Sequence, residues 1–189
     1  MTRLWCVRHG PTHAKAMVGW SDIPADLSDT RHVARVARHL PAGASVVTSD
    51  LSRARETATA LGLAGPRLPE MPGLREIHFG DWEMKRFDEI ADTERIRDFW
   101  DQPGDVAPPG GESWNAFSDR VDKATDTFLE GQHKDIIVVC HFGVILRMVQ
   151  RALGLSAREA FGHRIENLSV TRIDVSERGW KAVSINHHP

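Results

Sequence analysis

Hydrophobic and polar positions follow two patterns along this chain, one typical of strands and one of helices. Short apolar runs that end near turn residues are typical of buried strands. Such runs lie at 4–7, 44–48, 135–140, 170–175 and 181–185, and a further short strand is expected near 67–68. Glu177-Arg178-Gly179 predicts a turn between the last two strands.

Apolar residues spaced three and four apart predict the helices. Helices are expected over 31–40, 51–61, 86–100 and 144–153, and another from Glu112-Ser113 to about 128. Asp29 or Thr30 is expected to cap the first helix, and Ser49 or Asp50 the second. Segment 73–83 carries aromatic residues, carboxylates and glycines, and we expect an ordered loop over a pocket there.

The order of these elements predicts an α/β fold. We expect a three-layer α/β/α sandwich with a largely parallel central sheet. A chain of 189 residues has the length of one domain. The sequence therefore predicts a single domain over 1–189, with a helical and loop insertion at about 83–130.

Composition and charge narrow the classes of partner. The net charge is −2, which indicates no nucleic-acid partner, and no run is long enough to cross a membrane. The apolar residues before Arg8 are too few for a signal peptide. Cys6 and Cys140 lie inside apolar strands and are expected to be small buried hydrophobic residues. We therefore expect a cytoplasmic protein, and the sequence leaves a homodimer open.

Two of the predicted strands end on a histidine that lies near a glycine. The first strand runs into Arg8-His9-Gly10, and the strand at 135–140 runs into His141-Phe142-Gly143. A single histidine after a strand is more often structural than catalytic, but two such strands can place both imidazoles at one edge of a sheet. Ligands of open α/β sheets bind at the carboxyl ends of the strands. The pattern therefore favours a site that contains both histidines.

Arg53 lies in the first turn of the helix predicted to follow the second strand. A cation at that position opposes the helix dipole, so its presence needs an explanation. Backbone N–H groups at a helix start and a guanidinium together make an anion site. The alternative is an exposed arginine without a role.

Taken together, five motifs resemble those of the histidine phosphatase superfamily, which has the phosphoglycerate mutase-like fold. They lie at 7–10, 48–54, 74–83, 111–113 and 139–144, and they occur in the family's order over nearly the whole chain. Segment 74–83 resembles the small phosphatase branch, which includes the α-ribazole-phosphate phosphatases. The resemblance implies an α/β/α fold and phosphoryl transfer through a phosphohistidine.

The resemblance also implies catalytic roles for five residues. His9 resembles the nucleophile and Glu76 the proton donor to the leaving group, while Arg8, Arg53 and His141 resemble the groups that hold the phosphoryl oxygens. Two guanidiniums disfavour the imidazolium, so they should keep His9 neutral near pH 7. Burial and a nearby phosphate would both raise the pKa of Glu76, which keeps it protonated as an acid. No metal and no cofactor is expected, because the arginines supply the positive charge.

Other residues are expected near the substrate. By analogy with the family, Thr12 and the Glu112-Ser113 backbone lie close to the phosphate or the substrate. Trp20 belongs to a set of aromatic residues that offers the substrate an apolar wall, although at least two members are expected to be core instead. The set is Trp20, Phe79, Trp82 and Phe142.

The chain departs from the family pattern at three positions. Pro11 stands where Glu or Gln is common, which removes a polar side chain and a backbone donor. Lys15 stands where Asn is common, and it either reaches the phosphate as a point charge or faces water. Phe142 stands where Gly is frequent, which should narrow one wall of the pocket. These departures bear on substrate identity.

The short chain favours hydrolysis of a small phosphomonoester over mutase transfer, because mutases of the family carry longer insertions over the site. A phosphoglycerate mutase activity is the first alternative. A non-catalytic module that binds a phosphorylated ligand is the second, although all five residues assigned to chemistry are present. A protein-phosphohistidine phosphatase is the third.

Overall fold

The strands of the protein form one sheet. The computed structural model describes residues 1–131 and 133–189. Within them, the five strands β1 (Thr2–Arg8), β2 (Ser45–Thr48), β3 (Asp135–Cys140), β4 (Val170–Ser176) and β5 (Gly179–His187) lie in the order β2-β3-β1-β4-β5. All five longer strands expected from the sequence are confirmed. The expected short strand near 67–68 is a single parallel bridge between Val46 and Arg67.

The sheet is mixed, so the expectation of a largely parallel sheet is wrong in part. β1 pairs parallel with β3, and β3 with β2, whereas β4 pairs antiparallel with both β1 and β5. Only Glu177 and Arg178 separate β4 from β5, and a connection that short makes an antiparallel hairpin. The parallel half of the sheet, β2-β3-β1, is the half whose strands are joined through helices.

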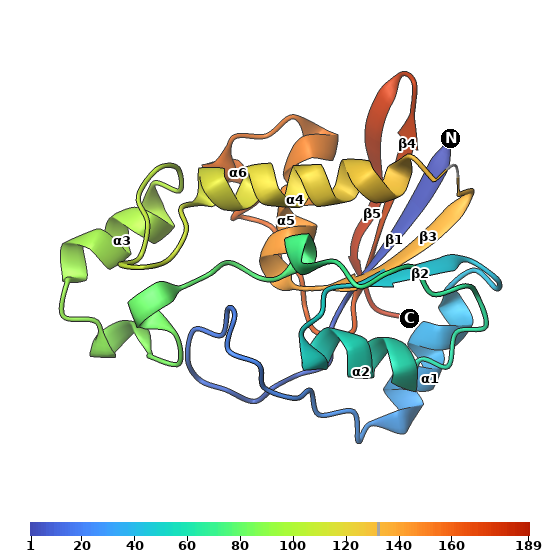
Figure 1. Ribbon diagram of the computed structural model, residues 1–189, viewed down its shortest axis with the longest axis horizontal. Helices are drawn as coiled ribbons and strands as arrows, with labels where there is room; N and C mark the ends of the chain where they lie inside the picture. The colour runs from blue at the N-terminus through green and yellow to red at the C-terminus, as the bar shows by residue number, and fades with distance from the viewer. Residues whose placement is uncertain (132) are drawn as a thin grey trace.

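Helices cover both faces of the sheet. Figure 1 shows α1 (Thr30–His39) and α2 (Ser52–Ala60) on one side, and α4 (Trp114–Leu129) and α5 (Phe142–Leu153) on the other. Successive residues of a strand point to opposite faces. In β3, Ile136 and Val138 therefore join the core under α4 and α5, while Ile137 and Val139 join the core under α1 and α2. This burial on both faces places the ends of β1 and β3 in the middle of the molecule.

Two helix starts test the predicted caps. The Asp29 side chain accepts a hydrogen bond from the backbone N–H of His32 and caps α1, as expected. The cap predicted for α2 is wrong, because Leu51 occupies the N-cap position and makes no side-chain cap bond. Asp22, from the long loop after β1, accepts from both the N–H and the hydroxyl of Ser52 instead, at 2.7 Å each. The start of α2 is thus tied to that loop.

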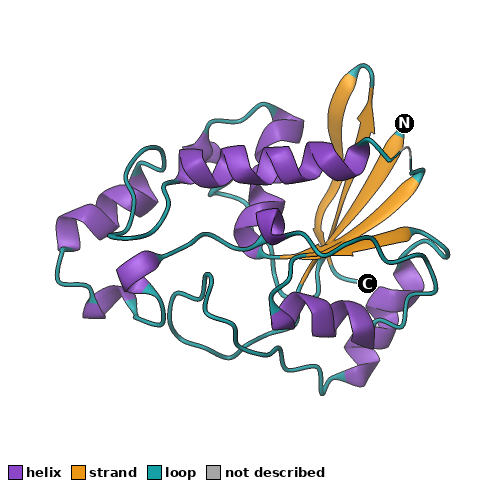
Figure 2. Ribbon diagram, viewed as in Figure 1, coloured by secondary structure: helices purple, strands orange, loops and turns teal. Residues whose placement is uncertain are grey.

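The predicted helix over 86–100 is interrupted. The chain forms a short 3₁₀ turn, η3 (Phe87–Glu89), and then α3 (Thr93–Asp101). Asp92 accepts from the N–H of Arg95 and so starts a new helix, which explains the break. Figure 2 shows loop on either side of these helices.

Other boundaries lie close to the predicted ones. Ser113 caps α4 by accepting from the N–H of Ala116, as expected of a helix opened by Glu112-Ser113. α5 begins two residues earlier than predicted, and α6 (Ala157–Ala160) was not predicted. The ordered loop at 73–83 contains the end of one 3₁₀ turn, η1 (Pro72–Leu74), and the whole of a second, η2 (Gly80–Trp82). Among the residues that the structure describes, no helix has the length and apolar character needed to cross a membrane.

Candidate active site

The two histidines predicted from the strand ends lie beside each other. β1 and β3 are parallel neighbours, with Arg8 opposite Cys140, so both strands end at the same edge of the sheet. The backbone N–H of His9 continues this ladder by donating to the Cys140 carbonyl at 3.0 Å. The ring centroids of His9 and His141 are 5.2 Å apart. Both rings are buried, with 6% of His9 and none of His141 exposed.

The backbone and its neighbours hold the His9 ring in one tautomer. Its Nδ1 lies 2.7 Å from the carbonyl oxygen of Gly10, which accepts only, so Nδ1 carries the hydrogen and Nε2 keeps a free lone pair. The side-chain amide of Asn167 donates to the carbonyl of His9 at 2.8 Å and secures its backbone. Burial, with the charge of Arg53 and then that of Arg8, lowers the pKa of His9 to about 3. The arginines therefore act as the sequence predicts, but burial has the larger effect.

His141 is also neutral. Its Nε2 lies 2.6 Å from the hydroxyl of Ser49, at the end of β2. Its Nδ1 is buried and has no hydrogen-bond partner among the described residues. Burial and then the neighbouring His9 lower the pKa of His141 well below its usual value. When the Ser49 hydroxyl donates to Nε2, Nδ1 carries a hydrogen that a ligand oxygen can accept.

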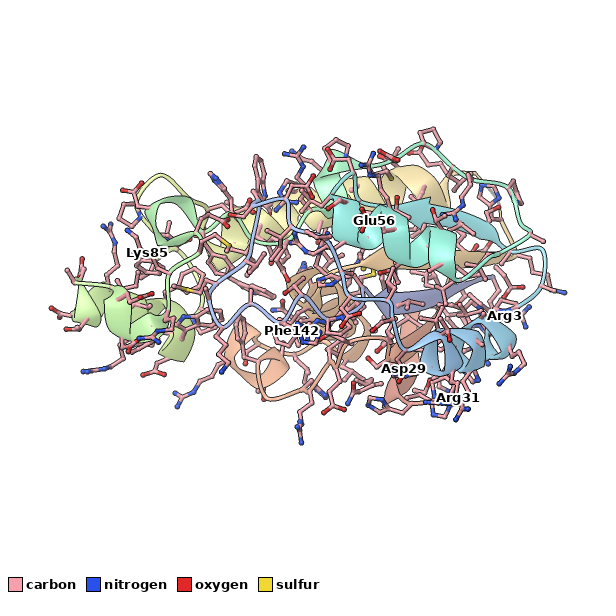
Figure 3. All side chains as sticks on the ribbon, turned by 90° about the horizontal axis from the view of Figure 1, so that it is seen from below. Arg3, Asp29, Arg31, Glu56, Lys85 and Phe142 are labelled. Carbon is pink, nitrogen blue, oxygen red and sulfur yellow. The ribbon has the colours of Figure 1, made fainter. Side chains whose placement is uncertain are left out.

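Arg8, the last residue of β1, contacts residues that follow β3 and precede β4. Its Nη1 donates to the carbonyl of Ile165 at 2.7 Å, while its Nε is buried without a partner in the described chain. The guanidinium carbon lies 5.5 Å from the centre of the Phe142 ring, within the range of a cation–π contact. Figure 3 labels Phe142 near the middle of the molecule and Lys85 toward one end of it. Phe142 thus lies against a cation of the site, as a wall residue would.

Arg53 is a buried cation at the start of α2, with 1% of its surface exposed. Its two Nη atoms donate to the carbonyls of Ser21 and Gly19, at 2.9 and 2.6 Å. Burial lowers the pKa of Arg53, while the charges of Glu76 and Asp22 act in the opposite direction. An arginine in a protein remains protonated even so, because its usual pKa is above 12. The alternative of an exposed arginine is therefore excluded.

Glu83 holds the loop that positions Arg53. Its carboxylate accepts hydrogen bonds from the N–H groups of Gly19, Trp20 and Ser21, at 3.0, 2.7 and 3.2 Å. It also accepts from the Ser21 hydroxyl at 2.7 Å. Burial alone would raise the pKa of Glu83, but these hydrogen bonds together lower it. The carboxylate thus turns the carbonyls of this loop toward the guanidinium.

Glu76 lies in the ordered loop and faces the start of α5. Oε1 of its carboxylate accepts from its neighbour Ile77 at 3.0 Å, and both of its oxygens accept from the N–H of Gly143, at 3.1 and 3.2 Å. Burial raises the pKa of Glu76, and these hydrogen bonds and the arginines oppose that effect only in part. A Cβ added at Gly143 would lie 2.4 Å from Oε1 of Glu76, so only glycine leaves room for this carboxyl group.

Of the remaining predicted residues, Trp20 and Glu112 contact the loop that carries Glu76, and their polar groups are already engaged. The indole N–H of Trp20 donates to the carbonyl of Glu76 at 2.9 Å, and its ring lies 4.5 Å from that of His78. The Glu112 carboxylate accepts from the N–H of His78 at 2.9 Å, and the Ser113 hydroxyl caps α4. Lys15 is exposed and Thr12 is half-buried. Phe79 and Trp82 are buried in the core, as expected for at least two of the aromatic set.

A cavity lies apart from His9, Glu76 and His141. It has a volume of about 900 Å³ and is lined by the segment at 68–73 and by residues of α4. None of His9, Glu76 and His141 lines it. The candidate site is therefore identified by its charged and polar side chains and not by this cavity.

Comparison with known proteins identifies the family of this chain. The family model described as "Histidine phosphatase superfamily (branch 1)" matches residues 4–188. The chain belongs to the histidine phosphatase superfamily. The adenosylcobalamin/alpha-ribazole phosphatase of Salmonella typhimurium is 32% identical over 188 residues, covering 93% of this chain and 91% of that protein. The "Probable phosphoglycerate mutase GpmB" of Serratia proteamaculans is 30% identical and covers 96% and 89%.

Solved structures of similar proteins share the fold. The crystal structure of the alpha-ribazole phosphatase from Shigella flexneri has a TM-score of 0.86 and 25% identity, and it covers 99% of this chain and 97% of that one. YhfR of Bacillus stearothermophilus has a TM-score of 0.89 and 26% identity, covering 99% and 98%. This histidine phosphatase therefore matches its relatives along nearly their whole length.

Sequence reasoning missed several residues that hold the site of this histidine phosphatase together. Ser49 was expected to cap a helix but contacts His141, and Asn167 lies in a loop with no pattern of its own. Glu83 lay in a recognised motif, without an assigned role. Arg120 lies beside the apolar stripe of α4. Its charge at the edge of that stripe was the one local feature of the sequence that could have indicated a structural role.

Proposed function

We propose that this chain is a phosphomonoesterase that hydrolyses a small phosphorylated metabolite through a phosphohistidine on His9. One observation carries the proposal: the bond from His9 Nδ1 to the Gly10 carbonyl leaves Nε2 as a neutral nucleophile, in a cluster with two arginines. A nucleophile must offer a lone pair, and a phosphoryl group needs fixed positive charge around its oxygens. Arg8, Arg53 and the free Nδ1 of His141 supply that environment.

The reaction proceeds in two displacements. His9 Nε2 forms a bond to phosphorus while the bond from phosphorus to the leaving oxygen breaks, and the carboxyl proton of Glu76 passes to that oxygen. Water then attacks the phosphohistidine, the N–P bond breaks, and the Glu76 carboxylate takes the proton that water loses. Inorganic phosphate leaves, and both His9 and Glu76 return to their first states.

The raised pKa of Glu76 supports its role as the acid. A carboxyl group acts as an acid only while it keeps its proton, and burial favours the protonated form. The hydrogen bonds from Gly143 and Ile77 favour the carboxylate instead, so the group is stabilised in both of the states it must adopt.

The substrate class follows from the relatives and the site wall. We propose a phosphomonoester with an organic leaving group, of the kind named for the alpha-ribazole phosphatases. The test is a panel of phosphomonoesters that includes α-ribazole 5′-phosphate, assayed for free phosphate without added metal. Rapid quenching followed by mass spectrometry should find one phosphoryl group on the peptide that carries His9. If the enzyme turns over without phosphorylating that peptide, the proposed intermediate is wrong.

Phosphoglycerate mutase activity is the second candidate, because relatives with that name are about as similar. Incubation with 3-phosphoglycerate separates the two activities. Release of free phosphate supports hydrolysis, whereas formation of 2-phosphoglycerate supports the mutase. Binding of phosphorylated ligands without turnover of any of them would instead indicate a non-catalytic module.

A further inference from the structure

The loop that carries Glu76 is held by one half-buried guanidinium. Nη1 of Arg120, from α4, donates to the carbonyls of Gly73 and Arg75, at 3.0 Å each. Nη2 of the same group donates to the carbonyl of Glu76 at 3.1 Å. Three backbone carbonyls around the acid are thus tied to one planar group.

Glu112 completes this support on the other side of the acid. Its carboxylate accepts from Nε of Arg120 at 3.2 Å and from Nη2, and it also accepts from the N–H of His78 at 2.9 Å. The N–H of Glu112 returns a hydrogen bond to the carbonyl of His78 at 2.9 Å. We call Arg120 and Glu112 the α4 bracket, since it holds the chain on both sides of Glu76.

The backbone of this loop is held by side chains rather than by regular secondary structure. Residues 75–79 belong to no helix or strand, so no regular ladder sets their positions. Besides the bracket, the Glu76 carbonyl is held by the indole N–H of Trp20. An acid transfers its proton efficiently only when its oxygen lies within hydrogen-bond reach of the leaving group, and a shift of about 1 Å has a large effect on rate.

We propose that Arg120 is a positioning residue, which through the α4 bracket holds the Glu76 carboxyl group in place for proton transfer to the leaving oxygen. This inference rests on the role proposed above for Glu76. Arg120 acts through backbone carbonyls and touches no reacting atom. Lysine cannot replace it, because a single ammonium lacks the planar fork that reaches three carbonyls and a carboxylate together.

Arg147 offers a matched control. It lies on α5 and binds Asp122 through Nε and Nη2, at 3.0 and 2.6 Å, so it too forms a two-point pair with a carboxylate. Its side chain is 21% exposed, as is that of Arg120. Its hydrogen bonds reach Asp122 and Gln150 rather than the loop that carries Glu76. Loss of this pair should therefore affect stability without moving the acid.

The test compares two substrates that need the acid to different degrees. p-Nitrophenyl phosphate releases a stable phenolate with little help from an acid, whereas β-glycerol phosphate releases an alkoxide that needs a proton. For Arg120→Gln and Arg120→Lys we expect kcat/KM to fall about 10-fold to 100-fold further with β-glycerol phosphate than with p-nitrophenyl phosphate. For Arg147→Gln the two substrates should lose activity equally.

A double-mutant cycle separates positioning from general destabilisation. Once Glu76→Gln has removed the acid, Arg120→Lys should cause no further selective loss with β-glycerol phosphate. If Arg120→Gln does not fold, Arg120→Lys and Glu112→Gln carry the same comparison. Equal losses with both substrates in these variants would overturn the inference.

The two proposals fail in different ways. If Glu76→Gln itself shows no dependence on the leaving group, the acid assignment is wrong and the proposed mechanism fails with it. If Glu76→Gln shows the dependence and the Arg120 variants do not exceed Arg147→Gln, only the positioning role fails.

Discussion

Two regions of this enzyme bring side chains to the candidate site on very different backbones. His9 and His141 follow the ends of adjacent parallel strands, and the ladder between β1 and β3 sets their spacing. Glu76 comes from an irregular loop, and Arg53 is held by carbonyls of a second irregular loop. The histidines therefore form a strand-borne half of the site, and Glu76 with the partners of Arg53 forms a loop-borne half.

The two halves are held by different forces. Backbone hydrogen bonds and apolar burial on both faces of the sheet fix the strand-borne half. Charged side chains fix the loop-borne half, because the Glu83 carboxylate and the Arg120 guanidinium each gather several backbone groups. A substitution in the strand-borne half should therefore remove a chemical group, whereas one in the loop-borne half should move a group that is still present.

The largest effect is expected from His9→Ala, which removes the proposed nucleophile. Loss of a nucleophile typically lowers the rate by about 10³-fold or more. We expect a fall of that size in kcat/KM with p-nitrophenyl phosphate, with thermal unfolding little changed because the ladder remains. His188→Ala, at a half-exposed histidine near the C-terminus, serves as the control. If kcat/KM of His9→Ala stays within about 10-fold of that of the parent, His9 is not the nucleophile.

Gly143→Ala tests the contact between the two halves, at the start of α5. The added Cβ would lie 2.4 Å from Oε1 of Glu76 and 3.1 Å from Cζ of Phe117, so the carboxyl group must shift. Helix propensity alone would favour alanine in α5, by about 1 kcal/mol. We therefore expect a fall of about 10-fold to 100-fold in kcat/KM with β-glycerol phosphate, from displacement of the acid.

The matched control for that variant is Gly104→Ala, whose added Cβ would meet no atom closer than 3.8 Å. Both variants should unfold at similar temperatures. Unchanged kinetics in Gly143→Ala would show that the loop-borne acid moves freely and that the tight contact has no consequence for the chemistry.

The strand-borne half was the part that sequence could predict. Apolar runs and the turn residues that follow them are local patterns, so both histidine strands and their common edge could be expected. Local patterns misled where a side chain has a distant partner. Ser49 is a typical cap residue, but in the structure it contacts His141, and Asp22 from a remote loop caps α2 instead.

The loop-borne half could be predicted only in part. Arg53 and Glu76 stand in recognisable motifs, but the groups that orient them are largely backbone carbonyls and N–H groups. Every residue has such groups, so they leave no signature in the sequence. The mixed sheet was missed for a related reason, since the pairing of β4 with β1 depends on the path of the chain after α5 rather than on the composition of either strand.

A smaller effect is expected from Glu83→Gln, which weakens the clamp on the loop that holds Arg53. A glutamine amide keeps one acceptor oxygen, whereas the carboxylate accepts from four N–H groups and a hydroxyl. We expect about a 10-fold fall in kcat/KM and a loss of about 1–3 kcal/mol in the free energy of unfolding, measured by urea denaturation. Glu70→Gln, at an exposed glutamate, is the control. If Glu83→Gln is less stable than the parent but has the same kcat/KM, Glu83 has a structural role only.

The last expected effects concern the pH dependence of stability, and they have opposite signs in the two halves. The pKa of His9 is about 3 in the folded protein against an ordinary 6.5, so between these values the unfolded chain binds a proton that the folded protein does not. The free energy of unfolding must then fall as pH falls from about 6.5 toward 3, by up to about 1.4 kcal/mol per pH unit for each such histidine. The pKa of Glu76 is raised from 4.5, so above that pH the folded protein keeps a proton that the unfolded chain loses. Glu76 therefore lowers stability as pH rises above 4.5, until its own raised pKa is passed.

Variants separate these two contributions, because each removes only one of them. Urea denaturation of the parent, His9→Asn and Glu76→Gln at intervals between pH 4.5 and pH 7 gives the slope of stability against pH for each. In His9→Asn the rise of stability with pH should be shallower than in the parent. In Glu76→Gln the rise should be steeper, since the opposing contribution of the buried carboxyl group is gone. If the slope changes in the same direction for both variants, folding does not shift the pKa values of His9 and Glu76 as described. The assignment of His9 as a neutral nucleophile and of Glu76 as a protonated acid would then be wrong.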